Sequence, residues 1–312
     1  MRSILREQSI LKDELLDAFG QSLGERGLSL ATVRGYLHDL GRLRGWLEGE
    51  AGGKPRDLRR ITAVDLVNYR QHLLGTERLQ AATINRKLQA IKTLFGWALD
   101  KGLVKENVAR VVRFVRVAER LCPQGLTESE VQSLLRVAGQ TRHGLAKRNY
   151  ALIELLLETG LRVGEVTDLR VADVDLHDRS GVVRVRECKG RKQRHVPLSS
   201  TARRALKLYL KDRGSLRQED HLFLSKRGGG QALSLRTIQA TVSDLARRAK
   251  LTRFAVSANS LRHSFALRFL SRHPGKLVEL AALLGHESID TTAVYIRPSM
   301  EKLDVDVEEG GE

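Results

Sequence analysis

The sequence has little of what several large protein classes require. Its 312 residues include only two cysteines, too few for a disulfide framework or a four-cysteine zinc site. No apolar run approaches the roughly 20 residues that cross a bilayer, so we expect no membrane partner. The first residues lack the apolar core of a signal peptide, and we therefore expect a cytoplasmic protein. Aromatic residues make up 4% of the chain, which disfavours a protein that stacks single-stranded bases.

Positive charge, by contrast, is abundant. Lysine and arginine number 54 against 37 acids, so the formal net charge is +17 and the pI is near 10.3. The last twelve residues hold six acids and one lysine, which leaves +22 on residues 1–300. This excess favours a polyanionic partner, and with so few aromatics we expect duplex DNA. Arg110, Arg113 and Arg116, with Arg120, are spaced for one helical face and are candidate DNA contacts, unless that face is simply solvated.

Hydrophobic periodicity divides the chain into two domains. Four helical patterns, at about 10–23, 30–48, 62–74 and 82–101, fill a first domain that has no strand signal. Thr62 precedes the third pattern as its N-cap, with Asp65 three residues later. We place the domain bounds at 1–115 for the helical domain, 116–125 for a linker, 126–298 for a second domain and 299–312 for an acidic tail.

The second domain mixes helices with one hairpin. Thr127 and Glu130 form a predicted capping box at its first helix. Residues 182–186 and 194–198 alternate as two strands around a basic turn. Further helices are expected at about 146–159 (ending at Gly160), 200–213, 234–250, 259–272, 276–284 and 289–296. The fold class is therefore mainly α with a small β-sheet in the second domain.

Five polar residues of the second domain each have an ordinary structural explanation. They are a surface arginine (Arg162), a solvated lysine (Lys189), an ion-paired arginine (Arg262), a helix cap (His286) and a half-buried tyrosine (Tyr295). Together they can transfer a phosphoryl group without a metal. Two arginines can clamp the non-bridging oxygens of a phosphodiester, a lysine can protonate the leaving oxygen, and a tyrosine can attack phosphorus. We find no metal-ligand cluster or Walker loop in the sequence that competes with this interpretation.

The order and spacing of four segments resemble the tyrosine recombinases, especially Xer-type recombinases and phage or transposon integrases. The segments are 159–165 (TGLRVGE), 188–198 (CKGRKQRHVPL), 261–266 (LRHSFA) and 283–295 (LLGHESIDTTAVY). Residues 28–47 and 83–108 resemble the helical core-binding domain of that family. The resemblance implies a C-shaped clamp on duplex DNA, with a helical core-binding domain and a catalytic domain.

The resemblance also implies roles for the five residues. Arg162 and Arg262 would bind the scissile phosphate, Lys189 would be the general acid, and His286 would be the third-motif histidine. Tyr295 would be the nucleophile. Such a site cuts and rejoins DNA at a specific sequence through a 3′-phosphotyrosine intermediate, without a cofactor, a metal or ATP. A topoisomerase of type IB would use the same chemistry.

Three more residues take expected roles. Glu165 matches a family acid that supports the site, although a carboxylate at a helix start explains it as well. Arg191 and Lys192, in the basic turn, are expected DNA contacts. The family assembles as a tetramer on synapsed DNA, so we expect a homo-oligomer, with or without a partner recombinase. The tail at 299–312 would dock on a neighbouring subunit or remain a frayed, solubilising end.

One position departs from the family pattern. Asn259 stands where the family usually has histidine, three residues before Arg262. Positions 259 and 262 share a helical face, so we expect Asn259 to project towards the phosphate. Its amide can donate a hydrogen bond but cannot shuttle a proton. His263 lies about 100° further round the helix, and we do not expect it to substitute. We expect retained activity with altered proton transfer; a DNA-binding protein with weakened catalysis is the alternative.

Overall fold

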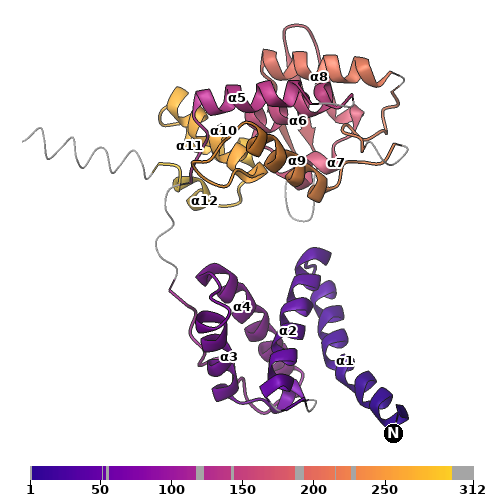
Figure 1. The fold of residues 1–312 in the computed structure, drawn as a ribbon, viewed down its shortest axis with the longest axis vertical. Helices are drawn as coiled ribbons and strands as arrows, with labels where there is room; N and C mark the ends of the chain where they lie inside the picture. Colours follow the sequence, from indigo (N-terminus) through magenta and orange to yellow (C-terminus); the bar gives the residue numbers. More distant parts are fainter. Residues whose placement is uncertain are drawn as a thin grey trace, which may run out of the picture. The chain divides into compact units, whose positions relative to one another are not determined.

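The computed structural model describes residues 2–50, 52–53, 56–116, 123–141, 144–186, 193–214, 216–225 and 230–296, with side chains from residue 14 onward. The chain divides into two compact units, Met1–Arg120 and Leu121–Glu312, which are taken in turn below (Figure 1). Among the described residues, no helix is long and apolar enough to cross a membrane.

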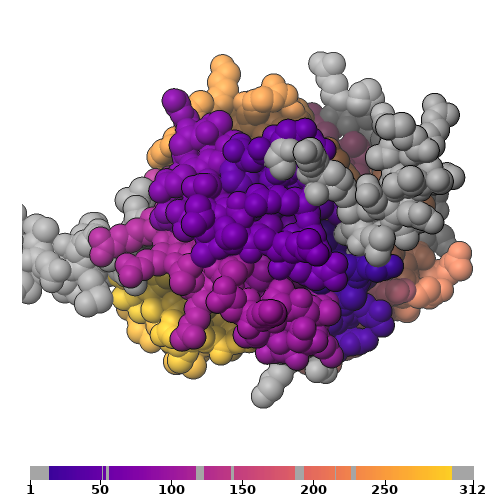
Figure 2. All heavy atoms as spheres, turned by 90° about the horizontal axis from the view of Figure 1, so that it is seen from below, coloured from indigo at the N-terminus to yellow at the C-terminus, as the bar shows by residue number. Residues whose placement is uncertain are grey.

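The first unit is helical throughout its described part, as the sequence predicts. Its elements are α1 (Arg2–Glu25), α2 (Leu30–Glu50), a short 3-10 helix (Leu58–Arg60), α3 (Ala63–Gly75) and α4 (Ala81–Asp100). Helix α4 carries the largest buried face, which includes Ile84, Leu88 and Leu94. The predicted N-cap is confirmed, because Thr62 and Asp65 form a reciprocal capping box. Figure 2 shows one face of this unit in indigo to purple, where the atoms of its helices form a continuous surface.

The segment after α4 does not form a helix on which the arginines could share a face. Residues 108–111 form a turn and 112–116 have no regular structure, so Arg110, Arg113 and Arg116 do not share a helical face; Arg120 lies outside the described residues. The reason is a tertiary contact: the Asn85 side chain accepts from the Val115 N–H at 2.7 Å and donates to its carbonyl at 2.8 Å. These two hydrogen bonds satisfy the backbone N–H and carbonyl of Val115 without a helix. The three described arginines are exposed.

Helix α6 is the centre of the second unit. The helices of this unit are α5 (Glu128–Gly139), α6 (Ala146–Thr159), α7 (Val163–Asp168), α8 (Ser200–Arg213), α9 (Leu235–Arg248), α10 (Ala258–Arg272), α11 (Leu277–Leu284) and α12 (Asp290–Ala293). Helix α6 packs against α5, α8 and α10 (Figure 1), and its leucines are fully buried. Nearly all of its residues from Arg148 onward are buried, so neighbouring elements cover this helix on most sides. The predicted capping box of Thr127 and Glu130 is confirmed at α5.

A small antiparallel sheet completes the second unit. It contains β1 (Val174–Leu176), β2 (Gly181–Val185) and β3 (Arg194–Pro197) in that order. The predicted hairpin is confirmed by the pairing of β2 with β3, in which Val183 lies opposite Val196. Strand β1 and helix α7 were not predicted, since three and six residues are too short for a periodic pattern. The helix expected at 289–296 is shorter, since α12 ends at Ala293.

Several expected features lie outside the described residues. The hairpin turn at 187–192 is one of them, and with it Lys189, Arg191 and Lys192. Most of the linker expected at 116–125 and the acidic tail at 299–312 lie outside as well.

Candidate active site

Two glycines allow three helices to meet at one point. Gly160 ends α6 in the left-handed conformation at φ 60°, and a Cβ there would overlap the Phe265 ring of α10. Gly285 ends α11 at φ 62°, and a Cβ there would lie 2.7 Å from an Arg194 nitrogen. An L side chain would therefore be strained and crowded at both positions. Glycine brings the end of α6, the end of α11 and the start of α10 into contact.

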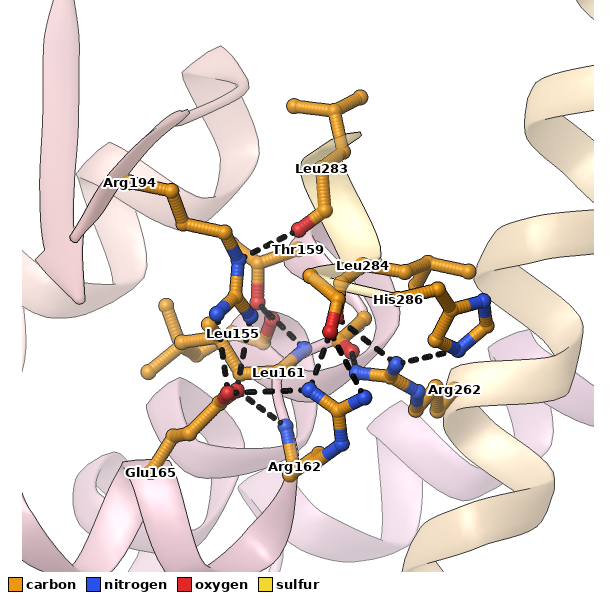
Figure 3. Close-up of polar contacts among 12 residues, drawn as sticks. Leu155, Thr159, Leu161, Arg162, Glu165, Arg194, Arg262, Leu283, Leu284 and His286 are labelled. Atoms are coloured by element: carbon orange, nitrogen blue, oxygen red, sulfur yellow. Dashed lines mark hydrogen bonds and ion pairs between the residues drawn. The ribbon is translucent and has the colours of Figure 1, made fainter. Parts of the chain in front are cut away.

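The carbonyl groups at the end of α11 hold two arginines side by side (Figure 3). Arg162 donates to the carbonyl oxygens of Leu284 at 3.0 Å and Gly285 at 2.9 Å. Arg262 donates to the same Leu284 oxygen at 2.9 Å and to the Gly160 oxygen at 2.6 Å. Carbonyls at a helix C-terminus lack partners within the helix and carry partial negative charge. The end of α11 thus orients guanidinium groups that are 100 residues apart in the sequence.

Glu165 and Arg194 lie on one side of this pair and support it (Figure 3). The Glu165 carboxylate accepts two hydrogen bonds from Arg194, at 2.9 and 2.8 Å, and one from the Arg162 backbone N–H at 2.8 Å. Arg194 also donates to the Leu283 carbonyl at 2.8 Å, so α11 anchors a third arginine. Burial favours a higher pKa for Glu165, but hydrogen bonds and charge from Arg194 and Arg162 outweigh it, and the pKa is lowered.

The sequence interpretation assigned no role to Arg194. It is one of several basic residues in the hairpin, and strand alternation alone does not separate it from the others. The signal that distinguishes it is its inward position on β3, where its side chain is only 11% exposed. A long cation is seldom so deeply buried without a carboxylate partner.

The cluster carries an excess of positive charge. Among the described residues of the cluster, Glu165 is the one carboxylate, and it hydrogen-bonds Arg162 and Arg194 but not Arg262. Three guanidinium groups therefore stand against one carboxylate. Burial, followed by the nearby charge of Arg162, lowers the pKa of Arg262 to about 10, so it remains charged at neutral pH. Net positive charge in a partly buried site favours an anion, and paired guanidinium forks match a phosphodiester.

His286 is neutral in this arrangement. Burial, and then the charges of Arg262, Arg162 and Arg194, lower its pKa to about 4. Its Nε2 lies 2.8 Å from an Arg262 nitrogen and its Nδ1 lies 2.7 Å from the Thr292 hydroxyl. Because a guanidinium only donates, Nε2 accepts and the imidazole proton resides on Nδ1. Without DNA, the N–H of His286 therefore points to Thr292.

Tyr295 lies just beyond α12 and is 5% exposed. Its ring belongs to a small apolar cluster with Ala266, Leu280 and Leu284. Burial raises the pKa of Tyr295, and the positive charges of Arg262 and Arg162 partly offset that rise. Its hydroxyl lies 2.7 Å from His263 Nδ1. Within the described part of the chain, no hydrogen bond joins this hydroxyl to either arginine.

His263 was not expected to substitute for the family histidine, because it lies about 100° further round α10. The structure places its Nδ1 2.7 Å from the Tyr295 hydroxyl, because Tyr295 approaches that side of the helix. Asn259 is exposed and shares this side, since its Nδ2 lies 3.2 Å from His263 Nε2. Arg262 instead points inward, to Gly160 and Leu284. The structure thus brings together Arg162, Glu165, Arg262 and His286 in one cluster, with Asn259 and Tyr295 joined through His263.

Comparisons with known proteins identify the family. Residues 124–302 match the sequence model of the Phage integrase family, and residues 16–102 match that of the Phage integrase N-terminal SAM-like domain. Tyrosine recombinase XerD of Mycobacterium tuberculosis is 37% identical over 285 residues, which cover 87% of this chain and 88% of that protein. Tyrosine recombinase XerC of Lacticaseibacillus casei is 32% identical over 284 residues, covering 89% and 92%.

A solved structure shows the same fold. The XerH site-specific recombinase bound to palindromic difH substrate, in a post-cleavage complex, matches with a TM-score of 0.71 and 22% identity over 92% of this chain and 82% of that one. The fold, the motif order and the two relatives agree. The chain belongs to the phage integrase family of tyrosine recombinases.

Proposed function

We propose that the protein is a site-specific recombinase that cuts and rejoins duplex DNA through a covalent bond between Tyr295 and a 3′-phosphate. The observation that carries this proposal is the convergence of Arg162 and Arg262 on the end of α11, beside an excess of positive charge. Two guanidinium forks so placed can bind the non-bridging oxygens and stabilise the charge of the transition state. Its relatives are named tyrosine recombinases.

The reaction then follows in two balanced steps. The Tyr295 oxygen attacks phosphorus while its hydroxyl proton passes to a base, and the bond from phosphorus to the 5′ oxygen breaks as that oxygen takes up a proton. Lys189, outside the described residues, is the proposed donor of the proton to the 5′ oxygen. In the second step a 5′-hydroxyl of the partner strand gives up its proton and attacks the phosphotyrosine, and the departing Tyr295 oxygen regains a proton. The phosphodiester energy is conserved, so the proposal includes no metal, cofactor or ATP.

Supporting groups have separate tasks in this proposal. Glu165 holds Arg162 and Arg194 in place through its hydrogen bonds. Asn259 contacts His263, which in turn contacts the Tyr295 hydroxyl. His286 donates a hydrogen bond to the phosphate once its Nε2 carries a proton. Burial and then the arginine charges lower the pKa of His286 to about 4, and the negative charge of a bound phosphodiester favours protonation because it counteracts those arginine charges.

The proposal is tested with a nicked duplex from which the cleaved 5′ strand end diffuses away. In buffer with EDTA and without ATP, we expect a covalent protein–DNA adduct, and sequencing of its junction identifies one specific site. Adducts and plasmid relaxation at unrelated sequences would instead indicate a topoisomerase. A protein that binds the duplex and forms no adduct would be a DNA-binding member of the fold without cleavage activity.

Binding should weaken steeply with salt. We propose that the exposed residues Arg110, Arg113 and Arg116, and the turn residues Arg191 and Lys192, contact DNA phosphates. With six or more phosphate contacts, affinity should fall about 10³-fold between 50 and 200 mM salt. Fluorescence anisotropy of a labelled duplex measures this slope.

A single contact can be tested in the same assay. Arg113→Ala should reduce the salt slope by about one unit. Arg217→Ala, which removes an exposed arginine outside the proposed contacts, should leave the slope unchanged. A flat salt response of the wild-type protein would contradict the proposed phosphate contacts.

We further propose a homotetramer on synapsed DNA, with or without a partner recombinase, in which residues 299–312 dock on a neighbouring subunit. Apolar residues alternate with acids in this segment, and a basic neighbour complements that charge. Deletion of residues 302–312 should impair synapsis of two sites, measured by native gel, more than it impairs binding to one site. Equal loss of both activities would contradict this role.

A further inference from the structure

His263 occupies a place that the proposed reaction has not yet used. It follows Arg262 on α10, and its half-buried ring lies against the Tyr295 ring with centroids 5.6 Å apart. One ring nitrogen, Nδ1, lies 2.7 Å from the Tyr295 hydroxyl, and the other, Nε2, lies 3.2 Å from the Asn259 amide. Within the described part of the chain, His263 is the one titratable side chain in hydrogen-bond contact with that hydroxyl.

The protonation states suit transfer from tyrosine to histidine. Burial, and then the charge of Arg262, lower the pKa of His263, so its ring is neutral at pH 7 and has a free lone pair. Burial raises the pKa of Tyr295, so its hydroxyl keeps its proton until the oxygen attacks. An attacking hydroxyl of this kind needs a base within hydrogen-bond distance to take the proton as the new bond forms.

The tautomer of His263 depends on Asn259. In the structure the Asn259 NH2 group faces Nε2. In this orientation it donates to Nε2 and the ring proton must lie on Nδ1, where the ring can only donate to Tyr295. A 180° turn of the amide presents its carbonyl oxygen instead. That oxygen accepts from Nε2–H and leaves the Nδ1 lone pair for the hydroxyl proton. Asn259 can thus set which nitrogen of His263 meets Tyr295.

We propose that His263 is the catalytic base for Tyr295 and that Asn259 is its positioning residue, an inference that rests on Tyr295 being the nucleophile. As the Tyr295 oxygen bonds to phosphorus, its proton passes to His263 Nδ1, while the carbonyl of Asn259 holds the proton on Nε2. The bond from phosphorus to the 5′ oxygen breaks, and a separate acid protonates that oxygen. In rejoining, Nδ1 returns its proton to the departing Tyr295 oxygen.

This assignment explains how a chain with asparagine at position 259 cleaves DNA. Asparagine has no titratable nitrogen, but it can orient a neighbouring imidazole four residues later on the same helical face. A chain of hydrogen bonds runs from Asn259 through His263 to Tyr295. Asn259 positions the imidazole, and His263 accepts the proton.

The test is the single-turnover rate of adduct formation on the nicked duplex. His263→Ala should slow this rate about 100-fold or more, with duplex binding unchanged. Added imidazole should restore cleavage, because a free base can enter the space left by the ring. A substrate with sulfur in place of the 5′ bridging oxygen should rescue Lys189→Ala, since a thiolate departs without a proton, but should not rescue His263→Ala. His273→Ala, at the exposed end of α10, is the matched control and should cleave like wild type.

Asn259 is tested by a conservative pair of variants. Asn259→Asp keeps an oxygen acceptor for Nε2–H and should cleave faster than a variant without one. Asn259→Leu removes it and should cleave about tenfold more slowly than wild type, a typical effect of losing the hydrogen-bonding partner of a working histidine. The ¹⁵N chemical shifts of His263 should show the Nε2–H tautomer in wild type and a mixture in Asn259→Leu. Equal rates for the two variants would overturn the positioning role.

The outcomes also separate this inference from the proposed function. If wild type forms no adduct, the proposed function fails, and the inference falls with it. If wild type forms the adduct and His263→Ala forms it within threefold of that rate, His263 is not the base and the proposed function stands. Loss of cleavage in His263→Ala without rescue by imidazole would likewise overturn the role as base.

Discussion

Tyr295→Phe should abolish the covalent adduct while leaving duplex binding unchanged. The substitution removes one oxygen and keeps the buried ring that packs against α10 and α11. The described hydrogen bond lost is the one to His263, so the free energy of unfolding should fall by only about 1 kcal/mol. Without a nucleophile, only phosphate binding and charge stabilisation remain, and adduct formation should fall about 10⁴-fold or more. A denaturing gel of protein and labelled nicked duplex measures the adduct.

Tyr209→Phe provides the control for this result. Tyr209 is also 5% exposed, and its hydroxyl accepts from the Leu224 backbone N–H at 3.3 Å. No described hydrogen bond joins this hydroxyl to Arg162, Arg194 or Arg262. This variant loses the same atom from a similarly buried ring and should form the adduct at the wild-type rate. An adduct that persists in Tyr295→Phe would show that a different residue attacks the phosphate.

Glu165→Ala should destabilise the second unit by about 3 kcal/mol, because removal of one partner from a buried ion pair leaves the other charge uncompensated. The side chains of Glu165 and Arg194 are each 11% exposed. The variant removes both hydrogen bonds to Arg194 and the cap on the Arg162 backbone, and three guanidinium groups then repel one another. The midpoint of urea unfolding should fall, and adduct formation should slow because Arg162 loses its position.

Asp244→Ala is the matched control for this stability loss. Its partner Arg247 is 76% exposed, and such surface pairs contribute about 0–1 kcal/mol. Dependence on pH gives a second check. The pKa of Glu165 lies below its ordinary 4.5, so its contribution is complete above pH 4.5 and is lost as the carboxylate protonates at lower pH. The gap between wild type and Glu165→Ala should therefore shrink below about pH 4.5. A gap under 1 kcal/mol at pH 7 would contradict the role of Glu165.

Local sequence patterns were sufficient for most of the fold. Helices of twelve or more residues show their apolar periodicity in the sequence. Each capping box, at Thr62 and at Thr127, lies within a segment of four residues and is therefore visible in the local sequence. The hairpin and the glycine end of α6 were likewise predictable. Among the site residues, Arg162, Arg262, His286 and Tyr295 could be named because their order and spacing resemble a known family. Their roles remain predictions for the experiments above.

Long-range contacts could not be predicted from local patterns. Arg194 is distinguished only by its hydrogen bonds to the Glu165 carboxylate, 29 residues earlier, and to the Leu283 carbonyl, 89 residues later. His263 gains its place through Tyr295, 32 residues later. The shared helical face inferred for Arg110, Arg113 and Arg116 is absent for the same reason, since Asn85, 30 residues before Val115, hydrogen-bonds with the backbone there. A helical wheel describes which residues share a side of one helix, but not which element approaches that side.

The carbonyl anchor at the end of α11 has a consequence for protein synthesis. Arg162 emerges from the ribosome 122 residues before Leu284, which corresponds to roughly 6–24 s at about 5–20 residues per second. During that interval, Arg162 lacks the Leu284 and Gly285 carbonyls that orient it, and Arg262, once made, has only the Gly160 carbonyl. A nascent chain therefore has no assembled phosphate clamp, even when its first unit is complete. Translation that stops before residue 284 leaves a product that lacks both the clamp and Tyr295.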